Sequence, residues 1–104
     1  MSEQVNHPNH YNIPGRKECI DEFVEKYGME YTIIWSVITA DKYLYRAGNK
    51  EGNSINQDLA KAEWYLNWAE NKLNNKCWSL EIIREMLSYI LPLKNTIKKL
   101  KQII

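Results

Sequence analysis

Apolar side chains recur at helical spacing along most of the chain. In residues 17–27 they fall at positions i, i+3, i+4 and i+7, which predicts one face of an amphipathic helix. Gly28 is expected to end that helix, because glycine often follows a helix C-terminus. Residues 31–34 form the only β-like run, so the pattern predicts an all-α fold.

A second helix is predicted over about residues 30–47, ending at Gly48. Its apolar stripe consists of Ile34, Val37, Ile38 and Leu44. Asp41 falls within this stripe, where burying a carboxylate without a partner would cost several kcal/mol. Asp41 is therefore expected either to join a buried ion pair or helix cap, or to face a ligand.

A third helix is predicted to start at Ser54, which forms a capping box with Gln57, and to run to about Asn74. Its core stripe is Leu59, Ala62, Leu66, Ala69 and Leu73. Trp64 and Trp68 lie one turn apart on a neighbouring face. They are expected to pack against another helix or subunit, or to form an aromatic wall on which a base stacks.

Residues 78–104 predict a C-terminal helix or helix pair, with Ser79 as the N-cap. Pro92 is expected to kink or divide this segment, because proline removes a backbone donor. The apolar stripe continues to Ile104 with lysines outside it, a pattern that predicts packing against another copy or docking on the same chain. The chain is therefore expected to be a single oligomeric domain of about four helices, over residues 1–104.

Residues 1–16 are expected to form an arm instead of a helix, because Pro8 and Pro14 restrict the backbone. This arm carries His7, His10 and Tyr11. Imidazoles in a loop can hydrogen bond to phosphate or base, and their charge is tunable near neutral pH. A metal site is not expected, since zinc needs three or four ligands and no second Cys/His pair follows.

The composition is that of a soluble globular protein and narrows the function classes. The net charge of +1 argues against a nucleic-acid-binding polycation. Two cysteines without a signal peptide predict a cytoplasmic protein, and no apolar run approaches the roughly 20 residues that span a bilayer. Four Trp and seven Tyr against one Phe favour a binding surface, because these rings combine apolar area with a polar tip.

The usual catalytic motifs are absent from the sequence, including a glycine-rich P-loop. Glu18 and Asp21 lie one helical turn apart, as in Mg²⁺-dependent helical nucleotide pyrophosphatases. No second pair with this spacing follows on another predicted helix, which disfavours a hydrolase. Lys42 and Arg46 form a basic edge that is expected to be solvated or to bind phosphate.

Four ordered motifs carry a resemblance to a known family. They are His7-Pro8-x-His10-Tyr11, Glu18-Cys19-Ile20-Asp21, Lys42-Tyr43-Leu44-x-Arg46-x-Gly48-x-Lys50 and Asp58-Leu59-x-Lys61-Ala62-x-Trp64-Tyr65-Leu66. In order and spacing they resemble the phage domain-of-unknown-function family 3310, often labelled nucleotide kinase-like, over about residues 5–70. The family-like helical core would span residues 17–74. The chain departs from the family's pattern at Ile38-Thr39 and at Asp41.

The resemblance implies a phage or prophage origin and action on nucleotides. It assigns ligand contacts to His7, His10, Tyr11, Glu18, Asp21, Lys42, Arg46, Lys50, Lys61 and Trp64. Asp41 joins this set because of its place in the apolar stripe. Cations would hold phosphate, and Tyr11 or Trp64 would stack on the base.

Three alternative functions are expected, each in the cytoplasm of an infected bacterial cell. The first is sequestration of a nucleotide, linear or cyclic, such as a signalling nucleotide of a host defence system, and it needs no cofactor. The second is a P-loop-less deoxynucleoside monophosphate kinase, with Mg²⁺ held by Asp21 or Asp41. The third is a protein-binding inhibitor of a host enzyme that uses the Trp-rich face. No catalytic residue is assigned.

Overall fold

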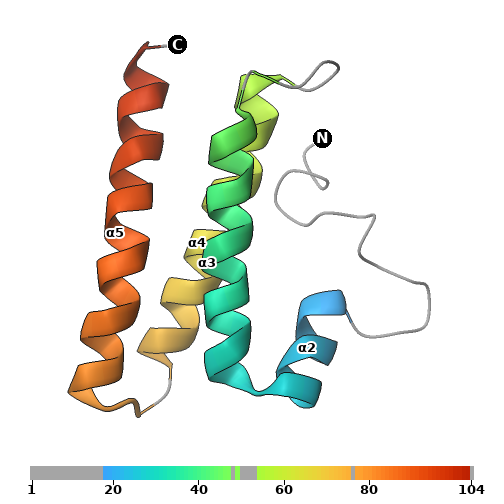
Figure 1. Ribbon diagram of the computed structural model, residues 1–104, viewed down its shortest axis with the longest axis vertical. Helices are drawn as coiled ribbons and strands as arrows, with labels where there is room; N and C mark the ends of the chain where they lie inside the picture. The colour runs from blue at the N-terminus through green and yellow to red at the C-terminus, as the bar shows by residue number, and fades with distance from the viewer. Residues whose placement is uncertain (1–17, 48, 50–53, 76, 104) are drawn as a thin grey trace.

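The computed structural model is all-α over the residues that it describes, 18–47, 49, 54–75 and 77–103. Four helices follow one another in these ranges and no strand occurs among them (Figure 1). They are α2 (Cys19–Tyr27), α3 (Met29–Arg46), α4 (Ile55–Asn74) and α5 (Leu80–Ile103). The predicted fold class is confirmed. The predicted arm with His7, His10 and Tyr11, and also Lys50, lie outside the described residues.

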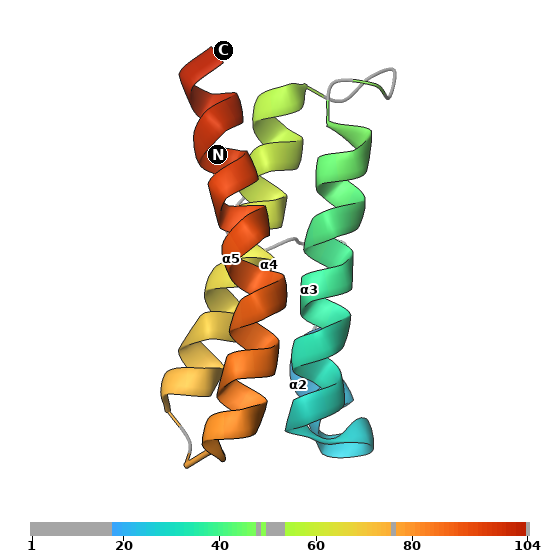
Figure 2. The same ribbon diagram turned by 60° about the vertical axis from the view of Figure 1, so that its left-hand side comes forward.

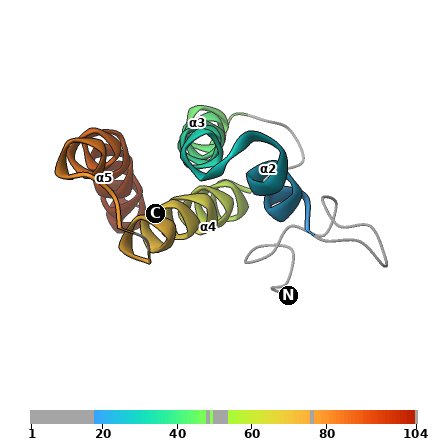
Figure 3. The same cartoon turned by 90° about the horizontal axis from the view of Figure 1, so that it is seen from below.

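Helices α3 and α4 form an antiparallel pair, and the other two helices pack around it. Figure 1 shows α3, α4 and α5 lying lengthwise, with the short α2 across the N-terminal end of α3. Figure 2 shows α5 running alongside both α3 and α4, which agrees with its contacts to both helices. Seen from below, α5 and α2 lie on opposite sides of the α3–α4 pair (Figure 3).

The core lies between α3 and α4 and is closed by α5. Small side chains at Ala40, Ala62 and Ala69 are fully buried and let the helices approach closely. Ser36 lies in the same interface, where its hydroxyl donates a 2.8 Å hydrogen bond to the carbonyl oxygen of Tyr65. The larger buried side chains are Ile20, Ile33, Val37, Tyr43, Leu59, Tyr65, Leu66, Leu73, Met86, Ile90 and Ile97.

The predicted buried face of α3 is partly wrong. Val37 is buried as expected, but Ile38 is 62% exposed, and Ile34 and Leu44 are only half-buried. The buried face also contains Ser36 and Thr39, whose hydroxyls donate to backbone carbonyls. These hydrogen bonds satisfy the two hydroxyls, so Ser36 and Thr39 can be buried. Small polar residues therefore occupy the buried face, where apolar periodicity predicts large apolar ones.

Asp41 is exposed on α3. The buried ion pair or helix cap expected from its place in the stripe is therefore wrong, whereas contact with a ligand stays a prediction. The physical reason is that the buried face of α3 is rotated about the helix axis relative to the predicted stripe. Asp41 therefore lies on the exposed side, where water solvates its charge.

Two predicted N-caps are confirmed. The Ser54 hydroxyl accepts a 3.0 Å hydrogen bond from the backbone N–H of Gln57 at the start of α4. The Ser79 hydroxyl accepts one of 3.2 Å from the N–H of Ile82 at the start of α5. Each satisfies a backbone donor that the helix leaves without a partner.

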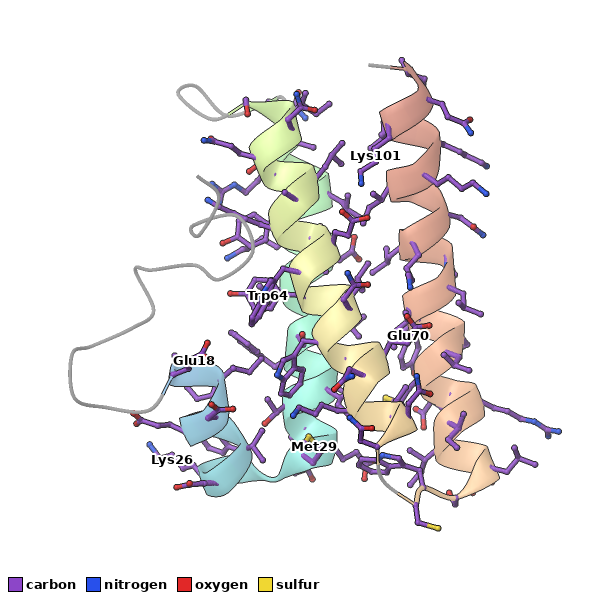
Figure 4. All side chains as sticks on the ribbon, turned by 180° about the vertical axis from the view of Figure 1, so that it is seen from behind. Glu18, Lys26, Met29, Trp64, Glu70 and Lys101 are labelled. Carbon is purple, nitrogen blue, oxygen red and sulfur yellow. The ribbon has the colours of Figure 1, made fainter. Side chains whose placement is uncertain are left out.

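Helix α5 is one continuous helix and docks on its own chain. Pro92 does not divide it, because Pro92 is on the exposed side, where water can reach the carbonyl left without an N–H partner. Lys94 pairs with Glu70 of α4, and Lys101 pairs with Glu63 at 2.9 Å. Figure 4 shows Glu70 and Lys101 where α4 meets α5.

None of the helices in the described part of the chain combines the length and the apolar character needed to cross a membrane.

We expect Leu66→Ala to lower the free energy of unfolding by about 2 to 5 kcal/mol, since it leaves a cavity in a fully buried site. Leu91→Ala is the matched control, because Leu91 is 48% exposed on α5 and should change stability by less than about 1 kcal/mol. Urea denaturation followed by circular dichroism measures both. Equal losses from the two variants would contradict the described core.

Candidate functional site

Three cationic side chains gather around the ring of Tyr43. The Nζ atom of Lys42 lies 5.0 Å from the ring centroid and that of Lys61 lies 5.5 Å away. The guanidinium carbon of Arg46 is also 5.5 Å from the centroid. These distances are those of cation–π contacts, in which the negative face of the ring attracts positive charge. We call Lys42, Arg46 and Lys61 the cation cluster.

The cation cluster exists because α3 and α4 are antiparallel. Lys42 and Arg46 belong to the last two turns of α3, one helical turn apart. Lys61 comes from the first half of α4, which runs back past the end of α3 (Figure 1). Residues distant in sequence therefore place three positive charges around one buried ring.

Tyr43 is held in place by a series of aromatic contacts. Its ring stacks on Tyr65 with centroids 6.1 Å apart and an interplanar angle of 12°. Tyr65 in turn meets Trp64 edge-on at 5.0 Å and Trp35 edge-on at 5.6 Å. Both tyrosines are buried, so the ring beneath the cation cluster is fixed by the core. Offset and edge-on ring pairs add stabilisation beyond the area that they bury.

Asp58 is a buried carboxylate at the same end of the α3–α4 pair. It has no exposed surface, and neither of its oxygens has a hydrogen-bond partner among the described residues. It lies in the first turn of α4, where the helix dipole favours negative charge. It also lies one turn before Lys61, on a neighbouring position of the helix surface. Asp58 is therefore a buried carboxyl group at the end of the α3–α4 pair that carries the cation cluster, with unused hydrogen-bonding capacity among the described residues.

Arg46 retains hydrogen-bonding capacity as well. Its Nε atom is buried and has no hydrogen-bond partner in the described part of the chain. A guanidinium presents its donors in a planar fork that matches phosphate or carboxylate oxygens. Together with the two lysines, it could bind a phosphorylated ligand.

Asp58 is a candidate that was not predicted from the sequence, although the sequence carries a signal for it. Asp58 precedes Ala62 by four residues and Leu66 by eight, so it falls on the core stripe predicted for α4. This is the same reasoning that selected Asp41 on α3. The structure buries Asp58 and exposes Asp41.

The predicted site residues separate into distinct locations. Lys42, Arg46 and Lys61 are brought together, and Trp64 joins them through Tyr65. Glu18 and Asp21 belong to the N-terminal end of α2, which packs on α3. Figure 4 shows Glu18 and Trp64 facing the same side of the molecule, opposite to the α5 side.

A hollow of about 310 Å³ lies on the surface of α4 next to Trp64. Its aromatic walls are Trp64 and Trp68, both half-buried. Asn67 and Asn71 also line it, and the Nζ atom of Lys72 lies 5.5 Å from the Trp68 ring. The two tryptophans therefore offer ring surface next to amide hydrogen-bonding groups.

In the ranges that the structure describes, no group of three or more His, Cys, Asp or Glu residues is arranged so that it could hold a metal ion.

Comparison with known families gives one match. The family model described as a protein of unknown function, DUF3310, matches residues 5–67, which is more than half of the chain. The chain belongs to the DUF3310 family. No curated protein and no solved structure matches it. The DUF3310 match includes the cation cluster, Asp58 and Trp64, whereas α5 lies outside it.

We expect Asp58→Asn to tighten binding of inorganic pyrophosphate. The amide keeps the shape of the side chain and replaces an ionisable group one helical turn from Lys61 with a neutral one. The expected gain is about 1 to 2 kcal/mol, or roughly tenfold in affinity, measured by isothermal titration calorimetry at low salt. Glu70→Gln is the control, because Glu70 is also on α4 but pairs with Lys94. Weaker binding by Asp58→Asn would show that the carboxylate orders the cations instead of opposing the anion.

Proposed function

We propose that the protein binds a nucleotide, with the phosphate at the cation cluster, and sequesters it. The observation that carries this proposal is the convergence of Lys42, Arg46 and Lys61 on the Tyr43 ring, within 5.0 to 5.5 Å of its centroid. Lysine and arginine are the side chains that proteins use to bind phosphate. Sequestration requires only affinity, which these charges supply without further chemical groups.

The base would stack on Trp64. Along α4, Trp64 lies about 4.5 Å from Lys61 and Trp68 about 10.5 Å from it, from the helical rise per residue. These two separations along the helix are in the range of the distance from phosphate to base in a mononucleotide. Stacking of a base on an aromatic side chain contributes about 1 to 3 kcal/mol and tolerates any base. The hollow beside Trp64 and Trp68 supports this arrangement.

We further propose a phage origin and action in the cytoplasm of an infected bacterial cell, where the bound nucleotide would be a signal of host defence. This part of the proposal rests on the family resemblance and on analogy with other small phage proteins. The oligomeric state predicted from the sequence is part of the same proposal.

Asp58 favours a second candidate function, a P-loop-less deoxynucleoside monophosphate kinase. Phosphoryl transfer depends on positioning and on charge neutralisation, commonly with a carboxylate that holds Mg²⁺ on the phosphates. Asp58 is a carboxyl group one helical turn before Lys61, with unused acceptor capacity among the described residues. Asp21 and Asp41, the residues that the sequence suggested for this role, are both exposed.

We expect Arg46→Ala to weaken nucleotide binding by about tenfold to a hundredfold, because a charge-assisted hydrogen bond contributes about 1.5 to 3 kcal/mol. Arg84→Ala is the matched control, since Arg84 is an exposed arginine on α5. Equilibrium binding of radiolabelled nucleotide measures both, with circular dichroism to verify helicity. Unchanged affinity in Arg46→Ala would place the site elsewhere.

Incubation with ATP, Mg²⁺ and a panel of linear and cyclic nucleotides separates the two candidate functions. The bound fraction is isolated, released by heat and analysed by chromatography, as is the free fraction. We expect one nucleotide to be recovered unchanged from the bound fraction. New nucleoside diphosphate in the free fraction would instead establish the kinase. If no nucleotide binds, both candidates are wrong and the third expected function, inhibition of a host enzyme, becomes the hypothesis to test.

A further inference from the structure

Helix α3 carries a row of large exposed side chains on the face opposite to the core. Tyr31 is 71% exposed, Ile38 is 62% exposed and Tyr45 is 85% exposed. They are spaced by seven residues, which is close to two helical turns, so they lie along one side of the helix. We call Tyr31, Ile38 and Tyr45 the outer stripe.

The outer stripe is continuous with further apolar surface at its N-terminal end. Tyr31 lines a hollow of about 340 Å³ together with Tyr27 and Trp35, and Tyr27 is itself 56% exposed. Single exposed apolar residues are ordinary on protein surfaces, but several large ones aligned on one side of a helix indicate an interaction surface. The row runs along most of α3, so a partner helix could follow it.

Charges of opposite sign border the outer stripe. Asp41 and Lys42 are both exposed and are consecutive in sequence, so they lie about 100° apart around α3. Relative to Ile38, Asp41 is about 60° to one side and Lys42 about 40° to the other. The stripe therefore has an acidic edge and a basic edge at the same height.

We propose that the outer stripe is the interface between two copies of this chain, with their α3 helices side by side and parallel. A two-fold axis along the helices brings the acidic edge of each copy to the basic edge of the other, so that Asp41 of each copy faces Lys42 of the other. An antiparallel pair would instead bring the two acidic edges to the same side, where like charges repel. The outer stripe is thus complementary to a second copy of itself in the parallel direction.

This interface lies on α3, away from the C-terminal segment, and it shares Lys42 with the proposed nucleotide site. For residues 78–104 the sequence left open packing against another copy or docking on the same chain, and the apolar stripe of α5 packs on its own chain through Met86, Ile90 and Ile97. Figure 3 shows α5, α4 and α2 on the remaining sides of α3. The outer stripe is on the side that they leave uncovered, which agrees with its exposure.

Sedimentation equilibrium of the full chain over a range of concentrations tests this proposal. We expect the wild-type chain to dimerise, and Ile38→Asp to weaken the dimer by roughly a hundredfold or more, because it buries two like charges at the centre of the interface. Leu91→Asp is the matched control, because Leu91 is an exposed aliphatic residue on α5 and should leave the dimer unchanged. Circular dichroism verifies that both variants stay helical.

A charge exchange tests the direction of the pair. Asp41→Lys and Lys42→Asp should each weaken the dimer by about tenfold, since each brings like charges together across the interface. The double variant Asp41→Lys/Lys42→Asp should recover the wild-type dimerisation constant. A double variant that dimerises no better than the single ones would overturn the parallel pairing.

Two further outcomes would overturn the interface itself. One is a wild-type chain that remains monomeric at every concentration, which would leave the outer stripe to a different protein. The other is a dimer that tolerates Ile38→Asp and dissociates with Leu91→Asp, which would move the interface to α5.

Discussion

The close antiparallel packing of α3 on α4 is the constraint on which the rest of the structure depends. Fully buried alanines let the two backbones approach, and the hydrogen bond from Ser36 to the Tyr65 carbonyl oxygen fixes their register. That register stacks Tyr43 on Tyr65 and so brings Lys61 next to Lys42 and Arg46. A shift of one helix along the other would disperse the cation cluster.

Much of the fold could be predicted from the sequence, because the positions and caps of the helices depend on residues that are close together in the chain. Helix positions follow from apolar spacing, and the caps at Ser54 and Ser79 follow from side chains that hydrogen bond within one turn. The buried face of α3 was harder to predict. Its inner side uses Ser36 and Ala40 where α4 approaches, while the larger Ile38 lies outside, and only the partner helix determines that choice.

The candidate site could also be predicted only in part, because the sequence shows which residues are close on one helix but not how two helices pack. Lys42 and Arg46 are one turn apart and can be paired from sequence, but Lys61 joins them only through the packing of α4 on α3. The two aspartates show the limit most clearly. Asp41 and Asp58 both fall on a predicted apolar stripe, and the stripe of α4 was correct whereas that of α3 was rotated. The expectation that a carboxylate on an apolar stripe is buried applied to both aspartates. It failed for Asp41 because the predicted buried face of α3 was wrong.

Lys42 connects the two faces of α3. It lies 5.0 Å from the Tyr43 ring centroid and also borders the outer stripe. A nucleotide phosphate and the carboxylate of a second copy would therefore draw on the same ammonium group. When two binding events share one cation, each lowers the affinity of the other by the same factor. Self-association would then oppose nucleotide binding, and the degree of opposition would depend on how much of the phosphate contact comes from Arg46 and Lys61. Because Arg46 and Lys61 approach Tyr43 as closely as 5.5 Å, the coupling should be partial.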